Sequence, residues 1–232
     1  MEREFIQELN DRFQGKSLSE SFENLIRLDL GKLAFSTSFG QEDQVITDFI
    51  FKNNYPIDVF TLDTGRLFEE TYEVYQRTVK KYDKSITPYF PDSKKVEALL
   101  SSKGPFSFYD SVENRKECCE IRKIDPLQRA LRGVDVWITG LRGEQSAFRK
   151  SFEPFQYDTS FGLIKFNPLV HWTLEDVEVY LKQHKVPQNS LHQKNFLSIG
   201  CAPCTRAVAK GEDIRAGRWW WENSKKECGL HK

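Results

Sequence analysis

The sequence predicts an α/β fold, with a mostly parallel sheet and helices on both of its faces. Short apolar runs alternate with amphipathic helical patterns along most of the 232 residues, which suffice for one sizeable core. Buried parallel strands are typically continuous apolar runs of this kind. From about residue 187 the alternation stops, so the remaining chain is expected to be an appendage to the core.

Apolar residues at helical spacing predict helix from residue 4 to about residue 28. The expected strands are the short apolar runs at residues 32–39, 58–62, 86–90, 134–139 and 163–166. The expected helices lie at residues 45–50, 68–82, 96–100, 118–131 and 173–185. Thr173 has the residue type of an N-cap, and Asp176 lies in the first turn after it.

The charge balance argues against nucleic acid or an anionic membrane as partner. Lys and Arg together number 34, as do Asp and Glu, so an anion site must be a local cluster. No apolar run approaches the roughly 18 residues of a membrane span, and the first residues do not resemble a signal peptide. A cytoplasmic protein with reduced thiols is therefore expected.

Four of the cysteines fall into two pairs. Cys118 and Cys119 are adjacent, and Cys201 and Cys204 follow after a gap of 81 residues. Two pairs can close one four-sulfur metal site, although adjacent helical cysteines diverge by about 100°. That divergence favours the spread corners of a [4Fe–4S] cluster, one per chain, over zinc. The alternatives are buried small apolar residues, or a redox disulfide at residues 201–204.

The fifth cysteine, Cys228, lies near the end of the sequence, in residues 227–231 (ECGLH). It is the candidate nucleophile because it lies outside the two pairs. A thiol near the end of the sequence also suits a nucleophile that must reach two different partners. A free thiol is only a few per cent ionised at pH 7, so it needs cationic neighbours. His231, Lys225 and Lys226 are close in sequence. The alternative is an incidental terminal thiol.

Three segments follow predicted strands, where open α/β sheets bind their ligands: residues 38–43, 63–66 and 140–146. Small and hydroxyl residues in the first two allow backbone N–H groups to approach an anion. A basic cluster lies further on, at Arg206, Lys210, Arg215 and Arg218. The alternatives are ordinary glycine turns and a solvated basic surface, and the tryptophans at 219–221 suggest packing or an interface. His171, His184 and His192 are expected to be structural or exposed.

Together these segments resemble the assimilatory sulfonucleotide reductases, which reduce adenylyl sulfate (APS) or phosphoadenylyl sulfate (PAPS). The resemblance covers roughly residues 30–232 and rests on the three strand-end segments, both cysteine pairs, residues 215–221 and residues 227–231. The cysteine quartet is similar to that of cluster-bearing members, which mostly use APS. Glu42 and Asp43 also resemble the APS group, because acidic residues would repel an extra phosphate. Gly143 departs from many members, which have arginine there.

The resemblance implies an adenine nucleotide alpha hydrolase-like fold, with a modified ATP-pyrophosphatase loop that holds nucleotide without hydrolysing it. Periodicity and the resemblance together divide the chain into an N-terminal helical segment at 1–29, a nucleotide-binding core at 30–186, and a C-terminal segment at 187–232 with a cysteine pair, arginines and a mobile catalytic tail. Cys228 would attack the sulfur of APS, release AMP and carry an S-sulfonate, which thioredoxin or glutaredoxin would reduce to sulfite.

The resemblance also implies the site residues. Cys228 and His231 would be catalytic, and Lys123 would lie between cluster and sulfate. The cluster ligands would be Cys118, Cys119, Cys201 and Cys204. The substrate would be bound by Ser38, Phe39, Gly40, Asp43, Leu62, Thr64, Gly65, Lys123, Gly140, Arg142, Arg149, Arg215 and Arg218.

Three other interpretations stay open at this stage. A PAPS-specific or dual-substrate reductase belongs to the same class. An ATP-dependent thiolation enzyme would need a Ser-Gly-Gly-x-Asp-Ser loop, which residues 36–43 lack. A non-catalytic zinc module would leave Cys228 incidental. The sequence also leaves open whether the chain forms a homo-oligomer.

Overall fold

The computed structural model describes residues 2–146 and 149–223. These residues form one six-stranded sheet of order β3-β2-β1-β4-β6-β5, in which only β5 runs antiparallel to its neighbour. The strands are β1 (Leu33–Ser36), β2 (Asp58–Leu62), β3 (Thr87–Tyr89), β4 (Val136–Ile138), β5 (Phe155–Asp158) and β6 (Leu163–Phe166). The predicted mostly parallel sheet is confirmed.

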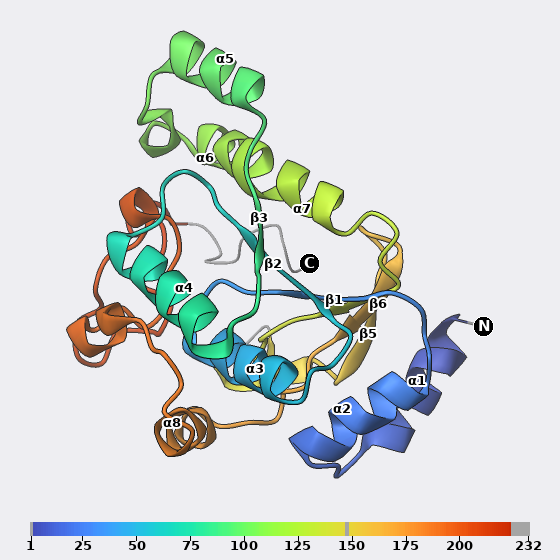
Figure 1. Cartoon of the computed structure of the whole chain (residues 1–232). Coiled ribbons are helices and arrows are strands. Elements are labelled where there is room, and N and C mark those ends of the chain that lie inside the picture. The colour runs from blue at the N-terminus through green and yellow to red at the C-terminus, as the bar shows by residue number, and fades with distance from the viewer. Residues whose placement is uncertain (1, 147–148, 224–232) are drawn as a thin grey trace.

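Helices cover both faces of the sheet (Figure 1). They are α1 (Glu2–Phe13), α2 (Leu18–Arg27), α3 (Gln41–Lys52), α4 (Glu69–Tyr82), α5 (Ser93–Lys103), α6 (Val112–Cys119), α7 (Asp125–Ala130) and α8 (Leu174–Gln183). Thr173 caps α8 as predicted, in a reciprocal capping box with Asp176. No helix among the described residues has the length and apolarity that crossing a membrane requires.

The two faces of the sheet bury different sets of side chains, because successive residues of a strand point to opposite faces. In β1, Leu33 and Phe35 join the larger apolar core, which also contains residues of α1, α2, α3, α4 and α8. Ala34 points the other way, into a smaller core with Leu127 and Leu131. Both faces are thus buried, which explains why this strand is a continuous apolar run.

The structure corrects three element predictions. Helix does not continue from residue 4 to about residue 28, because residues 14–17 separate α1 from α2. The helix predicted at 118–131 begins earlier, at Val112, and contains a π-helical turn over Glu120–Ile124 between α6 and α7. The edge strand β5 was not predicted, because four residues of mixed character carry little periodic signal. Its pairing with β6 produces the antiparallel edge of the sheet.

After α8, the described chain contains short 3₁₀ turns at Ser190–Lys194 and Ala202–Cys204 and a single bridge between Thr205 and Arg218. The loss of strand–helix alternation beyond residue 187 is therefore confirmed. The division into three parts at residues 29 and 186 stays a prediction. Leu9 and Phe13 of the first part belong to the same apolar core as the sheet.

Candidate functional site

A cavity of about 260 Å³ lies at the carboxyl ends of the strands. The chain adds β2 and β3 on one side of β1, and then returns to add β4 on the other side of β1. The strand order therefore reverses between β1 and β4. Open α/β sheets bind ligands at such a switch point. The cavity walls come from the strand-end segments at 36–43, 61–64 and 139–142, together with parts of the C-terminal segment, residues 197–200 and 214–218.

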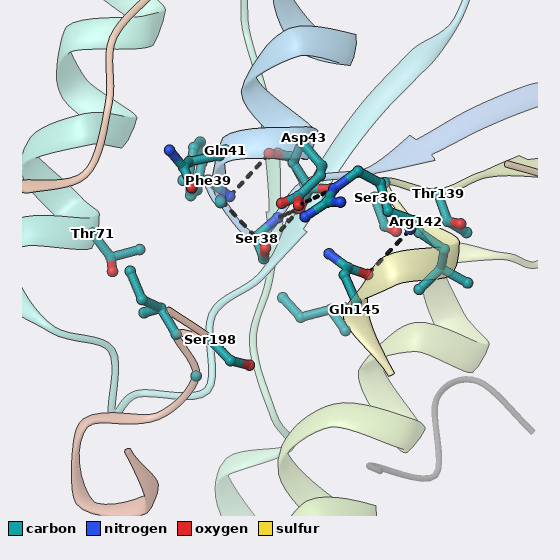
Figure 2. A pocket seen from close by; sticks show the side chains of 18 of the residues that line it. Ser36, Ser38, Phe39, Gln41, Asp43, Thr71, Thr139, Arg142, Gln145 and Ser198 are labelled. Carbon is teal, nitrogen blue, oxygen red and sulfur yellow. Dashed lines mark hydrogen bonds and ion pairs between the residues drawn. The ribbon is translucent and has the colours of Figure 1, made fainter. Parts of the chain in front are cut away.

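The structure brings together almost all of the predicted substrate residues. The side or main chains of the following residues line the cavity: Ser38, Phe39, Gly40, Asp43, Leu62, Thr64, Lys123, Gly140, Arg142, Arg149, Arg215 and Arg218. Gly65 does not line it, although Thr64 beside it does. Figure 2 shows the loop after β1 facing Arg142 and Gln145 across the cavity.

The loop after β1 is held by its own carboxylate. The backbone N–H and the hydroxyl of Ser38 both donate to Asp43 Oδ2, at 2.6 Å each (Figure 2). Gly140 makes this arrangement possible, because a Cβ there would lie 2.1 Å from Asp43 Oδ1. Phe39 adopts a left-handed φ of 60° and stacks its buried ring on Tyr75, with 4.8 Å between centroids. Burial raises the pKa of Asp43 to about 6, and the hydrogen bonds from Ser38 oppose this shift.

The acidic pair of this loop does not present two free negative charges. Glu42 Oε1 accepts from Arg142 Nε at 2.8 Å, and Arg142 is 2% exposed. Arg142 Nη1 also lies 2.9 Å from Glu144, so its guanidinium is committed to carboxylates of the protein. The charge of Glu42 is thus compensated. Simple repulsion of an extra phosphate by the Glu42–Asp43 pair is therefore a weaker argument than the sequence suggested.

Other cations supply a positive wall. Arg149 is buried and donates to Gln145 Oε1 at 2.5 Å. Arg218 Nη1 donates to Ser198 at 3.4 Å, and among the described residues Arg218 has no carboxylate partner. A Cβ at Gly200 would lie 2.4 Å from Arg218 Nη2, so the guanidinium packs closely against the backbone at Gly200. With Lys123 and Arg215, they place a concentration of positive charge at one site of a chain with no net charge.

The basic cluster predicted at residues 206–218 divides in two. Arg206 forms a bidentate pair with Glu212, at 2.9 and 3.0 Å, and Lys210 is exposed. Only Arg215 and Arg218 reach the cavity. The four residues were grouped because they are close in sequence, but in the folded chain Arg206 and Lys210 lie outside the cavity that Arg215 and Arg218 line.

A second, smaller cavity of about 20 Å³ is lined by both cysteine pairs, Cys118, Cys119, Cys201 and Cys204. The hydroxyl of Thr64 lies 3.3 Å from Cys201 Sγ. Burial raises the pKa of Cys119 to about 11 and of Cys204 to about 12. Among the described residues, no three His, Cys, Asp or Glu side chains converge as closely as a single metal ion requires.

The donor set of this smaller cavity nevertheless suits an iron–sulfur group. Sulfur ligands are soft, and such a group bound by four thiolates is anionic. The same cavity is lined by cations, namely Arg66, Arg115, Arg122 and Lys123, which would balance that charge. The alternative that Cys118 and Cys119 are merely buried small apolar residues is therefore disfavoured. Lys123 lines both cavities and so forms part of the wall between them.

Comparison with known proteins agrees with this geometry. A family described as "Phosphoadenosine phosphosulfate reductase domain" matches residues 32–207. An adenosine 5'-phosphosulfate reductase of Allochromatium vinosum is 47% identical over 205 residues, covering 88% of this chain and 80% of that protein. One from Neisseria meningitidis serogroup B is 50% identical over 200 residues, covering 85% and 81%. The chain belongs to the sulfonucleotide reductase family.

Solved structures extend the comparison. A phosphoadenylyl-sulfate reductase of Candida auris, crystallised with phosphate, superposes with a TM-score of 0.74 at 28% identity, covering 88% of this chain and 97% of that one. An FMN adenylyltransferase of Candida glabrata reaches a TM-score of 0.52 at 16% identity, covering 94% and 80%, which supports the fold alone. The predicted adenine nucleotide alpha hydrolase-like fold is thus confirmed for this sulfonucleotide reductase.

The two predicted catalytic residues, Cys228 and His231, lie outside the described residues, as do Lys225 and Lys226. Several cavity residues were not in the predicted set, among them Gln145 and His192. Gln145 accepts from Arg149 and from the backbone N–H of Arg142. His192, expected to be structural or exposed, lines the larger cavity, and within the described part of the chain neither of its ring nitrogens has a hydrogen-bond partner. Burial lowers the pKa of His192, which favours a neutral imidazole. A lone histidine in a loop carries no periodic signal that would have found it.

Proposed function

We propose that this sulfonucleotide reductase is an adenosine 5'-phosphosulfate reductase, which reduces APS to sulfite and AMP in assimilatory sulfate reduction. The observation that carries the proposal is the shared wall at Lys123, between a cationic nucleotide-sized cavity and a four-cysteine cavity. The extensive identity to proteins named APS reductase supports APS as the substrate.

The strand-end loops would hold the nucleotide. The loop at Ser38, Phe39 and Gly40 approaches the cavity with its main chain, and Asp43 fixes its shape. Because Gly140 has no Cβ, the loop after β4 can lie close to Asp43 in the loop after β1. Leu62 and Thr64 would contact the ligand from the end of β2. The unpartnered ring nitrogens of His192 offer a donor and an acceptor to the nucleoside portion of the substrate.

The cations would bind the sulfate and phosphate oxygens: Lys123, Arg149, Arg215 and Arg218. Guanidinium groups suit such oxygens because they donate in pairs from one plane. In the first step, the Cys228 thiolate attacks the sulfur of APS, and an S–S bond forms while the S–O bond to AMP breaks. AMP leaves with the bonding electrons, and the same cations stabilise the charge that develops on its phosphate.

The four paired cysteines would hold one [4Fe–4S] cluster per chain. When bound, the cluster would supply an anionic centre that orients neighbouring charges. The chain's own residues would do the rest: Arg66, Arg115 and Arg122 would balance the thiolate charge, and Lys123, which lines both cavities, would place a positive charge between cluster and substrate. The alternatives of a zinc module and a thiolation enzyme receive no support from the comparisons.

The remaining partners complete the proposal. Thioredoxin, or glutaredoxin in its place, would reduce the Cys228 S-sulfonate by thiol–disulfide exchange and release sulfite. His231, three residues after Cys228, would favour the thiolate. A reducing cytoplasm suits both this chemistry and unbridged cysteines. The segment 187–232 would contribute a cysteine pair, the arginines and a mobile catalytic tail, and residues 30–186 would form the nucleotide-binding core.

The test is to mix the anaerobically purified protein with APS and no reductant. The peptide that contains Cys228 should gain the mass of one sulfonate while AMP is released in equal amount. Cys228→Ser should release no sulfite but should keep its AMP affinity, iron content and brown colour. If the sulfonate appeared on Cys201 or Cys204 instead, the assignment of the nucleophile would be wrong.

Substrate choice needs a separate measurement, because Glu42 is paired with Arg142. We expect kcat/KM with thioredoxin to be roughly ten- to a hundredfold higher for APS than for PAPS, the range that one unfavourable phosphate contact gives. Equal values would identify a dual-substrate reductase. A preference for PAPS would show that the cysteine quartet does not report substrate choice.

A further inference from the structure

A group of aromatic side chains covers the outer side of the cysteine-lined cavity. Phe108 lines the cavity itself and lies 4.5 Å from Tyr109, measured between ring centroids. Tyr109 lies 4.4 Å from Trp221, which in turn lies 4.9 Å from Trp220. Phe106 contacts both Phe108 and Tyr109. We call Phe106, Tyr109 and Trp220 the aromatic surface.

These rings extend further outward than a cover for the cavity requires. Phe108 is 2% exposed and Trp221 is half-buried, and these two form the inner layer. The aromatic surface, in contrast, is 60% exposed at Phe106, 39% at Tyr109 and 41% at Trp220. Contiguous exposed aromatic side chains mark interaction sites, and tryptophan and tyrosine are enriched among residues that dominate binding energy.

The aromatic surface is held in place before any partner binds. Tyr109 donates from its hydroxyl to the carbonyl of Pro203, within the second cysteine pair, at 2.7 Å. Arg66 donates to the carbonyl of Pro105 at 2.6 Å and lies over the Phe108 ring at 5.0 Å. A preorganised surface loses less entropy on association than a loose one does.

Its position relative to Cys228 points to one kind of partner. Buried Arg115 and Glu222 form a two-bond ion pair, at 2.7 and 3.3 Å, which anchors the chain six residues before Cys228. An extended chain spans at most about 3.6 Å per residue, so Cys228 stays within roughly 20 Å of Glu222. Trp220 is two residues from that anchor. The surface around Trp220 therefore lies within the reach of Cys228, where a protein that attacks this thiol can dock.

We propose that Phe106, Tyr109 and Trp220 form the docking surface for the small dithiol protein that releases sulfite. This inference rests on the proposed function. A thiolate of the partner attacks Cys228 Sγ, a mixed disulfide forms, and sulfite leaves with the electrons of the broken S–S bond. The partner's second thiol then attacks its own sulfur in the mixed disulfide, restoring the Cys228 thiol. The partner is oxidised by two electrons, which are those that reduce the sulfur.

The experiment compares the Phe106→Ala/Trp220→Ala double variant with wild type and with a matched control, Phe5→Ala. Phe5 is 40% exposed on α1, at a distance from α6 (Figure 1). Three quantities are measured: S-sulfonate formation from APS without reductant, turnover with dithiothreitol, and kcat/KM for purified thioredoxin at saturating APS. Iron content is determined for each variant. The S-sulfonate assay on wild type tests the proposed function separately.

We expect kcat/KM for thioredoxin to fall at least about tenfold in the double variant, the loss of one dominant contact. S-sulfonate formation, dithiothreitol turnover and iron content should stay at the wild-type level, and Phe5→Ala should change none of them. Unchanged kcat/KM for thioredoxin would overturn the docking surface. A parallel loss of iron and of turnover with both reductants would also overturn it, since the rings would then serve as a cover for the cavity. Faster S-sulfonate formation in the double variant would assign the surface to the chain's own residues 224–232 instead.

Discussion

The two cavities of this sulfonucleotide reductase differ in how the chain builds them. The larger one is formed chiefly by loops that each follow a strand, so its walls are set by the topology of a parallel sheet. The smaller one joins a cysteine pair at the end of α6 to a pair in the C-terminal segment, and 81 residues lie between the two pairs. The first depends on the fold class, and the second depends on the C-terminal segment packing back onto the core.

This difference suggests a division of labour. The larger cavity has the cations and close backbone that a nucleotide needs, whereas the smaller one has the thiols and compensating charges that an iron–sulfur group needs. Lys123 belongs to both, and Thr64 connects them through its contact with Cys201. Any coupling between the two cavities should therefore act through these contacts.

The largest effect should come from Cys201→Ser. Loss of one sulfur ligand should remove iron and the brown colour, and sulfite release should fall below detection. If the cavities are as separate as their construction suggests, AMP affinity should change by less than about threefold. Iron analysis, absorption spectra and calorimetric AMP titration test this. Loss of AMP binding together with the colour would show that the cavities form one cooperative unit.

Lys123→Ala should affect catalysis without removing the metal. We expect kcat to fall about a hundredfold, because a positioned cation near developing charge typically contributes that much. The matched control is Lys116→Ala, an exposed lysine of α6, which should keep wild-type kcat and iron content. Steady-state kinetics and iron analysis distinguish the two. Equal kcat in both variants would contradict a role for Lys123 at the shared wall.

Arg218→Ala should weaken nucleotide binding more modestly, by about tenfold in the Kd for AMP, the value of one charge-assisted hydrogen bond. Arg206→Ala is the control, because Arg206 pairs with Glu212 away from the cavity. Titration calorimetry at fixed ionic strength measures both. A comparable loss in Arg206→Ala would restore the single basic cluster that the sequence suggested.

The smallest effect concerns pH and stability. The pKa of Asp43 is about 6 in the folded chain, above its ordinary 3.8. Folding therefore favours the protonated form, so the free energy of unfolding contributed by Asp43 falls as pH rises from about 4 to 6 and stays low above that. Because the cavity opens to solvent, we expect the free energy of unfolding to fall by about 1 kcal/mol, which is less than the whole difference in pKa would give. The Asp43→Asn variant cannot titrate at this position, so its free energy of unfolding should not show this fall.

Urea unfolding without nucleotide, at several pH values, provides the measurement. The difference in unfolding free energy between Asp43→Asn and wild type should increase in favour of the variant between about pH 4 and pH 6. A difference that is constant with pH would show that Asp43 titrates near its ordinary pKa, and that the hydrogen bonds from Ser38 outweigh burial.

Much of the site was accessible to sequence reasoning for a local reason. Ser38, Asp43 and Gly140 lie within a few residues of strand ends, so an apolar run followed by small and polar residues was enough to find them. His192 was not found, because its place in the cavity depends on how a 3₁₀ turn of the C-terminal segment packs against the core. Gly65 shows the opposite case, since it belongs to a strand-end loop but does not line the cavity.

The sequence by itself determined the α/β class, the mostly parallel sheet, the strand-end loops and the separation of the cysteines into two pairs and one single residue. Those features depend on periodicity and residue type, which act over a few neighbouring positions. The tertiary structure alone decided that Arg142 is neutralised by Glu42, that Arg206 and Arg218 face different surroundings, and that Lys123 adjoins both cavities. Ion pairing joins residues 100 or more positions apart, and no local pattern encodes which charges will meet.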